Sequence, residues 1–303
     1  MIHLQNTIQK MKKTHHSEFG QIQSIFIKHA AQAFVSQDKI AKEWKELNFL
    51  SEPSFQKAIE EYKEFENLLK STGASVHYLN EDKSVSMDSI YCRDASIATD
   101  FGMIICNMGK VGRINEPQAE KKAFEEANIK ILGEITVPAT VEGGDVAWLD
   151  EKTLAVGHTY RTNEEGISQL KALLNPHGVE VLTVSLPHYR GASDVFHLMS
   201  ILSPVDKNLA VVYSPLMPIA FRNELLKRGY ELVEVPDEEF DTMGCNVLAL
   251  SPRNCLMVSG NPITKERLLS AGCTVAEYEG SEISVKGGGG PTCLTRPLVR
   301  NID

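Results

Sequence analysis

The segment from residue 145 to residue 186, DVAWLDEKTLAVGHTYRTNEEGISQLKALLNPHGVEVLTVSL, contains one complete structural unit. DVAWLD and TLAVGH are two short apolar strands on either side of a polar turn at Glu151 and Lys152. A helix is expected to start at Asn163 and to reach about Leu174, after which VEVLTVSL returns to strand. The segment therefore predicts a hairpin, a helix and a further strand, in the order ββαβ.

The same order of elements recurs on both sides of this segment. Each recurrence has two apolar strands around a polar turn, then a helical pattern, then one more strand. The helical patterns of these three units cover about residues 117–128, 217–228 and 262–270. The units start near Asp94, Glu142, His197 and Asn246, and Cys293 follows the last, at intervals of 48, 55, 49 and 47 residues. A period near 50 residues is typical of a repeat architecture.

The N-terminal part supplies an incomplete fifth unit. IQSIFIK is a strand, Ser54 to Leu69 a long helix, and ASVHYL a second strand, while the C-terminal CLTRPLVR can provide the missing hairpin partner. The ends of the chain would then meet, which predicts an α/β fold of five pseudo-fivefold ββαβ units in a single domain over residues 1–303. The alternative is a two-domain α/β protein with coincidental spacing, since 303 residues correspond to about two domains of roughly 150 residues.

The composition excludes several classes of protein. With 42% hydrophobic and 23% charged residues, the chain is typical of a globular protein with a sizeable core. Its net charge of −9 disfavours nucleic acid or an anionic membrane as partner and suits a small cationic ligand. Its six cysteines form no CxxC pair, and no segment has the roughly 20 apolar residues of a membrane span. We therefore expect a cytoplasmic protein.

Two residues indicate nucleophilic catalysis. Cys293 follows four glycines in GGGGPTCLTRP, which allow close backbone approach and can hold a thiol exposed at a site. His197, in DVFHLMSIL, is expected to open a strand at the start of another unit, so the two side chains can form a nucleophile and acid/base pair. Taken singly, Cys293 could be a small buried hydrophobe and His197 a satisfied core histidine. The glycine run lacks the GxxxxGK[ST] pattern of a phosphate loop.

Two carboxylates decide the class of chemistry. Asp94 and Glu142 lie between apolar residues, and buried carboxylates need a cation or several hydrogen-bond donors. Arg93 or another basic residue could neutralise them structurally. Alternatively the cation is the substrate, since a planar guanidinium matches carboxylates as bidentate acceptors.

At this point the sequence resembles a known family. The runs DSIYCRD, VEGGDV, GHTYRTNEEG, HLMS and GGGGPTCLTRP, in this order and spacing, resemble the guanidino-group-modifying pentein superfamily. Its members include dimethylarginine dimethylaminohydrolase, arginine deiminase and the amidinotransferases. The resemblance covers about residues 88–300 and implies a five-bladed α/β propeller.

The resemblance also implies roles for individual residues. Cys293 would be the nucleophile, His197 the general acid/base, and Glu142 would hold the guanidinium and orient His197. Asp94 would bind the guanidinium nitrogens, and Arg161 of the RTNxxG motif would bind a substrate carboxylate. The reaction would be hydrolysis of a guanidine C–N bond through a covalent thiouronium adduct, with a citrulline-like product and no metal or organic cofactor.

Three positions depart from the patterns of individual members. Met199 stands where arginine deiminases carry an aspartate, which favours the dimethylarginine dimethylaminohydrolase type. In that type, however, the position of Arg93 resembles Glu, and a carboxylate-binding arginine stands near Asn107. Arg161 would then anchor the substrate alone. An arginine dihydrolase branch tends to have Asn at the position of Asp94 and is disfavoured.

Several alternatives stay open at this stage. An amidinotransferase would need the same residues, a non-catalytic binding module of the same fold would not need the Cys, His and acids together, and a papain-like protease would not explain Asp94 and Glu142. Asp88 and Asn246 are further candidates for substrate binding, and Arg93 and Asn107 for lining the site. A homodimer is also possible.

Overall fold

The computed structural model describes residues 12–302, and the strands of this range form five separate sheets. Four sheets have three strands each and one has four. Their strands, in spatial order, are β4 (Ser96–Ile97), β5 (Met103–Ile105) and β6 (Ile131–Glu134); β7 (Val146–Asp150), β8 (Thr153–His158) and β9 (Glu180–Ser185); β10 (Leu202–Asp206), β11 (Leu209–Val212) and β12 (Glu231–Glu234); β13 (Leu248–Ser251), β14 (Asn254–Val258) and β15 (Thr274–Tyr278); and β1 (Lys12–Thr14), β16 (Thr295–Ile302), β2 (Gln21–Ile27) and β3 (Ser75–Tyr78).

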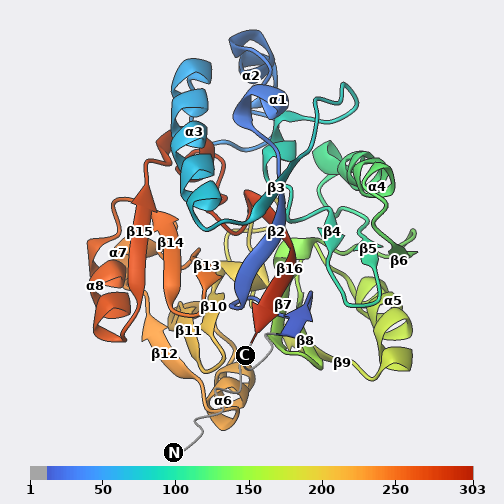
Figure 1. The fold of residues 1–303 in the computed structure, drawn as a ribbon. Coiled ribbons are helices and arrows are strands. Elements are labelled where there is room, and N and C mark those ends of the chain that lie inside the picture. The colour runs from blue at the N-terminus through green and yellow to red at the C-terminus, as the bar shows by residue number, and fades with distance from the viewer. Residues whose placement is uncertain (1–11, 303) are drawn as a thin grey trace, which may run out of the picture.

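Each three-stranded sheet repeats the same pairing. Its first two strands form an antiparallel hairpin, and the third joins parallel to the second after a helix. A parallel partner requires such a crossover connection. The connecting helices are α4 (Glu116–Glu126), α5 (Glu164–Leu174), α6 (Ile219–Lys227) and α8 (Pro262–Ser270), and α3 (Phe55–Ser71) has the same place between β2 and β3. In Figure 1 these five helices lie on the outside of the molecule and the strands lie inside.

The four-stranded sheet joins the two ends of the described chain. β16 pairs antiparallel with β2, from Thr295 opposite Ile27 to Asn301 opposite Gln21, and β2 pairs parallel with β3. The C-terminal strand thus supplies the hairpin partner that the N-terminal unit lacks, as the sequence predicted. The α/β fold class is confirmed.

Short helices were not foreseen. α1 (Ala30–Ala33), α2 (Gln37–Glu43) and α7 (Asp237–Phe240) have four to seven residues, too few to show a clear helical period. The ends of the longer helices were predicted better, because Ser54 and Asn163 accept hydrogen bonds from backbone N–H groups as N-caps of α3 and α5.

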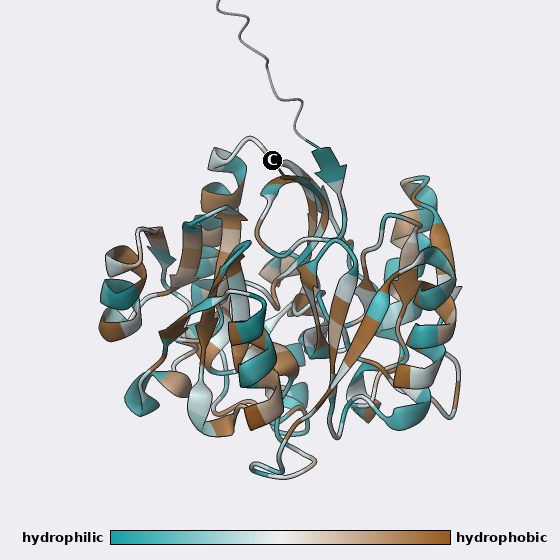
Figure 2. Ribbon diagram, turned by 90° about the horizontal axis from the view of Figure 1, so that it is seen from below, coloured by the Kyte–Doolittle hydropathy of each residue, from teal (hydrophilic) through white to brown (hydrophobic). Residues whose placement is uncertain are grey.

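The core consists of apolar side chains between the strands and the inner faces of the helices. Hydrophobic residues concentrate on the strands in Figure 2, whereas the helices alternate between hydrophobic and hydrophilic faces. Buried ion pairs interrupt this core, among them the pair of Arg93 Nη2 and Glu18 Oε1 at 2.8 Å. None of the helices between residues 12 and 302 is long and apolar enough to cross a membrane.

The candidate site residues occupy equivalent places in the five sheets. Asp94, Glu142, His197, Asn246 and Cys293 each lie a few residues before the first strand of a sheet or, for Cys293, before β16. His197 does not open a strand as predicted: it precedes a single 3₁₀ turn at Leu198–Ser200, and β10 begins only at Leu202. This turn moves the imidazole out of the strand ladder and leaves it free to face the cavity described next.

Candidate active site

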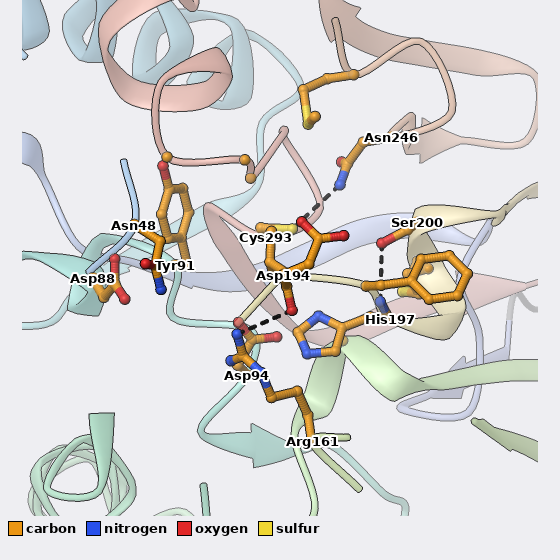
Figure 3. Close-up of a pocket in the computed structure, with 18 of the residues that line it drawn as sticks. Asn48, Asp88, Tyr91, Asp94, Arg161, Asp194, His197, Ser200, Asn246 and Cys293 are labelled. Carbon is orange, nitrogen blue, oxygen red and sulfur yellow. Dashed lines mark hydrogen bonds between the residues drawn. The ribbon is translucent and has the colours of Figure 1, made fainter. Parts of the chain in front are cut away.

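A cavity of about 230 Å³ lies where these pre-strand segments meet. Figure 3 shows Asp94, Asp194, His197 and Cys293 around it, contributed by segments far apart in the sequence. All seven predicted site residues contribute to the cavity or to its wall. Six of them line it, namely Asp88, Asp94, Arg161, His197, Asn246 and Cys293, and Glu142 lies directly behind His197.

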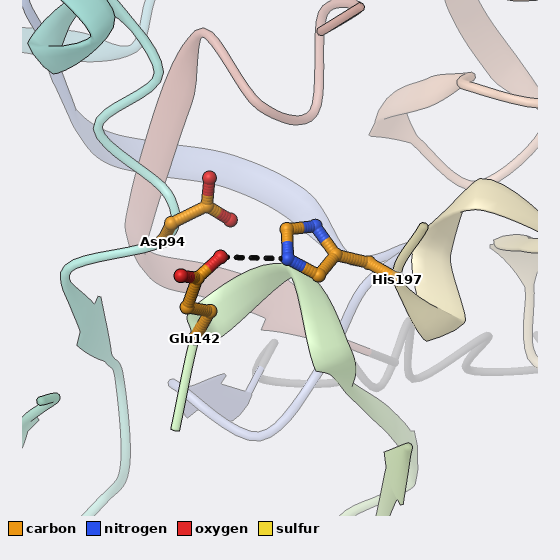
Figure 4. Close-up of side chains that lie close together, drawn as sticks. All are labelled: Asp94, Glu142 and His197. Atoms are coloured by element: carbon orange, nitrogen blue, oxygen red, sulfur yellow. Dashed lines mark hydrogen bonds and ion pairs between the residues drawn. The ribbon is translucent and has the colours of Figure 1, made fainter. Parts of the chain in front are cut away.

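The imidazole of His197 is held by a buried carboxylate. Its Nε2 atom lies 2.8 Å from Glu142 Oε2, and Asp94 lies beside this pair (Figure 4). One ligand-type atom from each of the three side chains lies within 4.8 Å of the others. Such a set could also offer three ligands to a metal ion, but Glu142 already accepts hydrogen bonds from Lys110 N at 2.9 Å and from Arg161. The prediction that no metal is needed stays a prediction.

Gly144 makes this close arrangement possible. A Cβ atom at position 144 would lie 2.5 Å from His197 Nδ1 and 2.7 Å from Asp94 Oδ1, closer than real contacts allow. The second glycine of the VEGGDV run therefore leaves room for the two side chains to face each other. Asp94 Oδ1 is buried and has no hydrogen-bond partner in the part of the chain that the structure describes. A buried carboxylate oxygen without a donor is costly, so this atom is suited to receive a donor from a ligand.

Protonation of the pair follows from its surroundings. Burial opposes the ionisation of Glu142, but the hydrogen bond and charge of His197 and the charges of Arg161 and Arg113 outweigh it and lower the pKa of Glu142. Burial lowers the pKa of His197, but the charge of Asp145, the hydrogen bond to Glu142 and the charge of Asp94 raise it overall to about 9. At neutral pH the pair is thus carboxylate and imidazolium, and His197 can donate a proton.

Cys293 differs from the other five cysteines, since they are buried and it is partly exposed. Asn246 Nδ2 donates to its Sγ atom at 3.2 Å (Figure 3), and Asn246 Oδ1 accepts from Thr292 N at 3.0 Å. Burial and the charge of Asp94 raise the pKa of the Cys293 thiol, and the hydrogen bond from Asn246 opposes this only in part. The thiol is therefore protonated at neutral pH. Cys245 also lines the cavity, although its thiol is buried.

The four glycines before Cys293 wrap closely around neighbouring side chains. A Cβ atom at Gly287 would lie 1.9 Å from Tyr91 Oη, so no side chain fits there. The run therefore serves close packing against the wall of the cavity, in agreement with the role expected from the sequence.

Two predicted substrate-binding residues already have partners. Asp88 Oδ2 accepts from Lys110 Nζ at 2.6 Å. Arg161 Nη1 lies 3.3 and 3.4 Å from the two oxygens of Glu142, and its Nη2 lies 3.3 Å from the backbone oxygen of Asp194. These last contacts are long for charge-assisted hydrogen bonds, which are typically about 2.7–2.9 Å. The Arg161 guanidinium is therefore held loosely.

Arg113 and Asp145 are among the residues at or beside the cavity that the sequence analysis missed. Arg113 lines the cavity and donates hydrogen bonds to Asp94 Oδ2 at 2.5 Å and to Glu116 Oε2 at 2.7 Å. Asp94 is therefore neutralised by Arg113 and not by Arg93. Asp145 accepts from Leu198 N at 3.0 Å and fixes the turn that carries His197. The sequence offered a signal for Asp145, because it ends the EGGD motif. For Arg113 the sequence offered no signal beyond the presence of an arginine between Asp94 and Glu142.

The expectations for Arg93 and Asn107 are wrong. Neither residue lines the cavity: Arg93 pairs with Glu18, and Asn107 Nδ2 donates to Ala139 O at 2.6 Å. Arg113 and Arg190 also line the cavity, and the expectation that Arg161 anchors the substrate alone stays a prediction.

Comparison with known proteins agrees with this geometry. Residues 28–300 match the family described as N,N dimethylarginine dimethylhydrolase, eukaryotic. The chain belongs to this family. The predicted superfamily and enzyme class, an amidine hydrolase that acts on C–N bonds, are thereby confirmed.

Individual relatives are distant. The chain is 26% identical over 246 residues to N(G),N(G)-dimethylarginine dimethylaminohydrolase of Pseudomonas aeruginosa, covering 81% of this chain and 90% of that one. It is 27% identical over 213 residues to arginine deiminase of Listeria welshimeri, covering 58% of this chain and 51% of that one.

Solved structures share the fold. A dimethylarginine dimethylaminohydrolase adduct with 4-chloro-2-hydroxymethylpyridine matches with a TM-score of 0.74 at 23% identity, over 93% of this chain and all of that one. The N-terminal domain of ArgZ, a cyanobacterial arginine dihydrolase bound to product, matches with a TM-score of 0.78 at 20% identity, over 92% and 97%.

Proposed function

We propose that this protein is a cysteine hydrolase that cleaves a C–N bond of an arginine or N-methylated arginine and releases a citrulline-like ureido product. The observation that supports this most directly is Asp94 Oδ1, a buried carboxylate oxygen without a partner beside the Glu142 and His197 pair. A guanidinium brings both the positive charge and the N–H donors that this oxygen lacks.

The first step is attack on the bound guanidinium. Its positive charge lowers the pKa of the Cys293 thiol, which burial and Asp94 raise in the free enzyme. The Cys293 thiol releases its proton to solvent, and the thiolate forms a bond from Sγ to the guanidinium carbon. One C–N bond then breaks as imidazolium His197 gives its proton to the leaving amine, and a thiouronium adduct remains.

The second step is hydrolysis of this adduct. Neutral His197, oriented by Glu142, takes a proton from water while the water oxygen bonds to the adduct carbon. The S–C bond then breaks, its electron pair returns to Cys293 Sγ, and the hydroxyl proton left on the adduct passes to this sulfur to restore the thiol. The ureido product leaves, and His197 is again the imidazolium. Water supplies the oxygen, so the cycle is balanced without a redox partner.

The remaining predicted residues have supporting roles in this proposal. Arg161 binds the substrate carboxylate, since its guanidinium is loosely held. Asn246 holds the Cys293 thiol in position through its 3.2 Å contact. Asp88, paired with Lys110, contributes to the cavity wall on the side of Asp94.

A substrate panel tests the proposal. Arginine, methylated arginines, agmatine and guanidino acids are incubated with the protein, and ureido product and released amine are both measured. We expect one arginine-type compound to give equal amounts of the two products. Cys293→Ser should abolish turnover with the fold intact, and full activity of that variant would disprove the mechanism.

The same assay separates the amidinotransferase alternative. With glycine added, a transferase would release ornithine from arginine in amounts that depend on glycine, and no ureido product would form. We expect ureido product whether or not glycine is present. Names of relatives, which include an aminohydrolase and deiminases, support hydrolysis.

We also propose that the five sheets are the blades of a single propeller domain. The repeated ββαβ pairing, the closure of the last sheet by β16 and β2, and the meeting of equivalent pre-strand residues at one cavity support this arrangement. Homodimer formation and a cytoplasmic location stay predictions.

A further inference from the structure

A second cavity, of about 140 Å³, lies apart from the catalytic residues. Its walls are Lys28, which follows β2, the segment 79–89 after β3, and one face of helix α4. Its charged lining residues are Lys28, Glu81, Asp82, Glu116, Glu120, Lys122 and Glu126.

Lys28 is the unusual group in this cavity. The residue is only 3% exposed, yet its Nζ atom has no hydrogen bond or ion pair with any residue between 12 and 302. The Nζ atom is not among the fully enclosed polar atoms and lies at the cavity, where a group that accepts hydrogen bonds can reach it. Burial lowers the pKa of Lys28, and the negative charges of Glu116 and Glu120 oppose that shift.

Two buried carboxyl groups line the same cavity on α4. Glu116 is 3% exposed and binds Arg113, whereas Glu120 is 5% exposed and accepts only from Ser96 Oγ, at 2.8 Å. Neither carboxylate comes within 4.0 Å of Lys28 Nζ as an ion pair, although both influence its charge. Burial raises the pKa of Glu120 to about 8, as expected for a carboxyl group that lacks a cation. At neutral pH Glu120 is therefore mostly protonated, and a positive charge placed beside it would lower its pKa and restore the carboxylate.

The charges select the chemical class of the ligand. A simple anion would contact Lys28 but would be repelled by Glu81, Asp82 and Glu126, and a simple cation would be repelled by Lys28. A molecule with a carboxylate and an ammonium a few ångströms apart satisfies both sides. From this we infer that the second cavity binds a small zwitterionic amino acid, with its carboxylate at Lys28 and its ammonium at Glu120.

The position of Glu116 connects this cavity to the catalytic one. Glu116 holds Arg113 through Nε at 3.0 Å and Nη2 at 2.7 Å, and Arg113 Nη1 holds Asp94 at 2.5 Å. Glu120 lies one helical turn from Glu116 on α4, so an ammonium at Glu120 also competes with Arg113 for the Glu116 carboxylate and weakens the contact of Arg113 with Asp94. This coupling, unlike the binding site itself, rests on the proposed function.

Calorimetric titration without substrate tests the site. Glycine, alanine and ornithine are compared with acetate and methylamine, which carry one charged half each. We expect at least one amino acid to bind tenfold or more tightly than either half. Lys28→Met and Glu120→Gln should each weaken that binding at least tenfold, whereas Lys130→Met, which removes an exposed lysine outside the cavity, should leave it unchanged. Thermal unfolding of each variant verifies that it folds. If one of the two cavity variants, Lys28→Met or Glu120→Gln, does not fold, the other is sufficient for the test.

Three results would overturn the site. The first is that the amino acids bind no more tightly than acetate or methylamine. The second is that Lys28→Met binds the amino acid as tightly as wild type does. The third is that a crystal soaked with the amino acid shows only water between Lys28 and Glu120. For the coupling, the amino acid should change the KM of the guanidino substrate about fivefold in wild type but not in Lys28→Met. An unchanged KM would overturn the coupling. Calorimetry measures binding without turnover, whereas the substrate panel measures the reaction. Failure of the proposed reaction and failure of the proposed binding site can therefore be distinguished.

Discussion

His197 Nε2 and Glu142 Oε2 are 2.8 Å apart, and neither side chain is accessible enough for water to replace this contact. The pair keeps His197 protonated at neutral pH, because a pKa of about 9 lies well above the ordinary 6.5. Stability from this raised pKa is fully present below pH 6.5 and is lost as the pH rises through 9. The proton that His197 holds is also the one that the leaving amine needs in the proposed reaction.

Glu142→Gln should therefore lower the pKa of His197 and the activity together. Glutamine keeps the shape but not the charge, so the imidazolium loses its main hydrogen-bonded partner. We expect kcat to fall by about 10² or more, as for loss of general acid catalysis. An NMR titration of the His197 ring measures the pKa independently of activity. An unchanged His197 pKa in Glu142→Gln would contradict the role of this contact.

Alkylation of Cys293 should depend on the charge of the reagent. Because the pKa of the thiol is raised in the free enzyme, its reaction with neutral chloroacetamide should increase steadily with pH above neutrality and show no plateau there. Cationic 2-chloroacetamidine brings its own positive charge to Asp94 and should react about tenfold faster or more at pH 7.

The control for this experiment is Asp94→Asn. Loss of the carboxylate should remove most of the preference for the cationic reagent and should bring the pKa of the thiol closer to its ordinary value, because Asp94 raises it. Equal rates for the two reagents in wild type would show that the cavity does not recognise amidinium groups.

Much of the fold could be predicted because its signals are local and repeated. The helix α5 began after Asn163 and ended at Leu174, as expected from the apolar period, and β16 was expected from an unpaired strand at the C-terminus. The short helices α1, α2 and α7 could not be predicted, because tertiary packing and not periodicity determines them.

The residues that meet at one cavity could be predicted where reactive chemistry and position in the repeat coincide. Cys293, His197 and Asp94 carry reactive groups at equivalent places in the repeat, so all were assigned to one cavity. Arg113 and Lys110 were missed, because their importance comes from partners distant in sequence, Asp94 and Asp88. Arg93 was misassigned for the same reason: its neighbour in sequence is Asp94, but its guanidinium lies against Glu18.

The buried pair of Arg93 and Glu18 should be important for stability and not for chemistry. Arg93→Met leaves the Glu18 carboxylate buried without its cation, which should destabilise the fold by about 3–5 kcal/mol. Burial alone would raise the pKa of Glu18, but Arg93 and Arg300 lower it overall. The stability this provides is present above the ordinary pKa of Glu18 and is lost as the pH falls below it.

Urea unfolding at pH 7 measures the effect of Arg93→Met, with Lys227→Ala as the control. Lys227 is 81% exposed in its pair with Glu224, so its loss should change stability by no more than about 0.5 kcal/mol. If the two variants have the same unfolding midpoint, the Arg93 pair does not stabilise the fold.

Gly144→Ala should damage the site while sparing the fold. The added methyl group would lie 2.5 Å from His197 Nδ1 and 2.7 Å from Asp94 Oδ1, so one of the two must move. Displacement by about 1 Å can reduce the rate by about 10². Gly133→Ala is a matched control, since its methyl group would lie 2.6 Å from the end of the Leu173 side chain, which is flexible and does not line the catalytic cavity. We expect Gly133→Ala to retain wild-type kcat and Gly144→Ala to lose most of it with an unchanged circular dichroism spectrum. If Gly144→Ala kept full activity, the close approach of His197 and Asp94 would be irrelevant to catalysis.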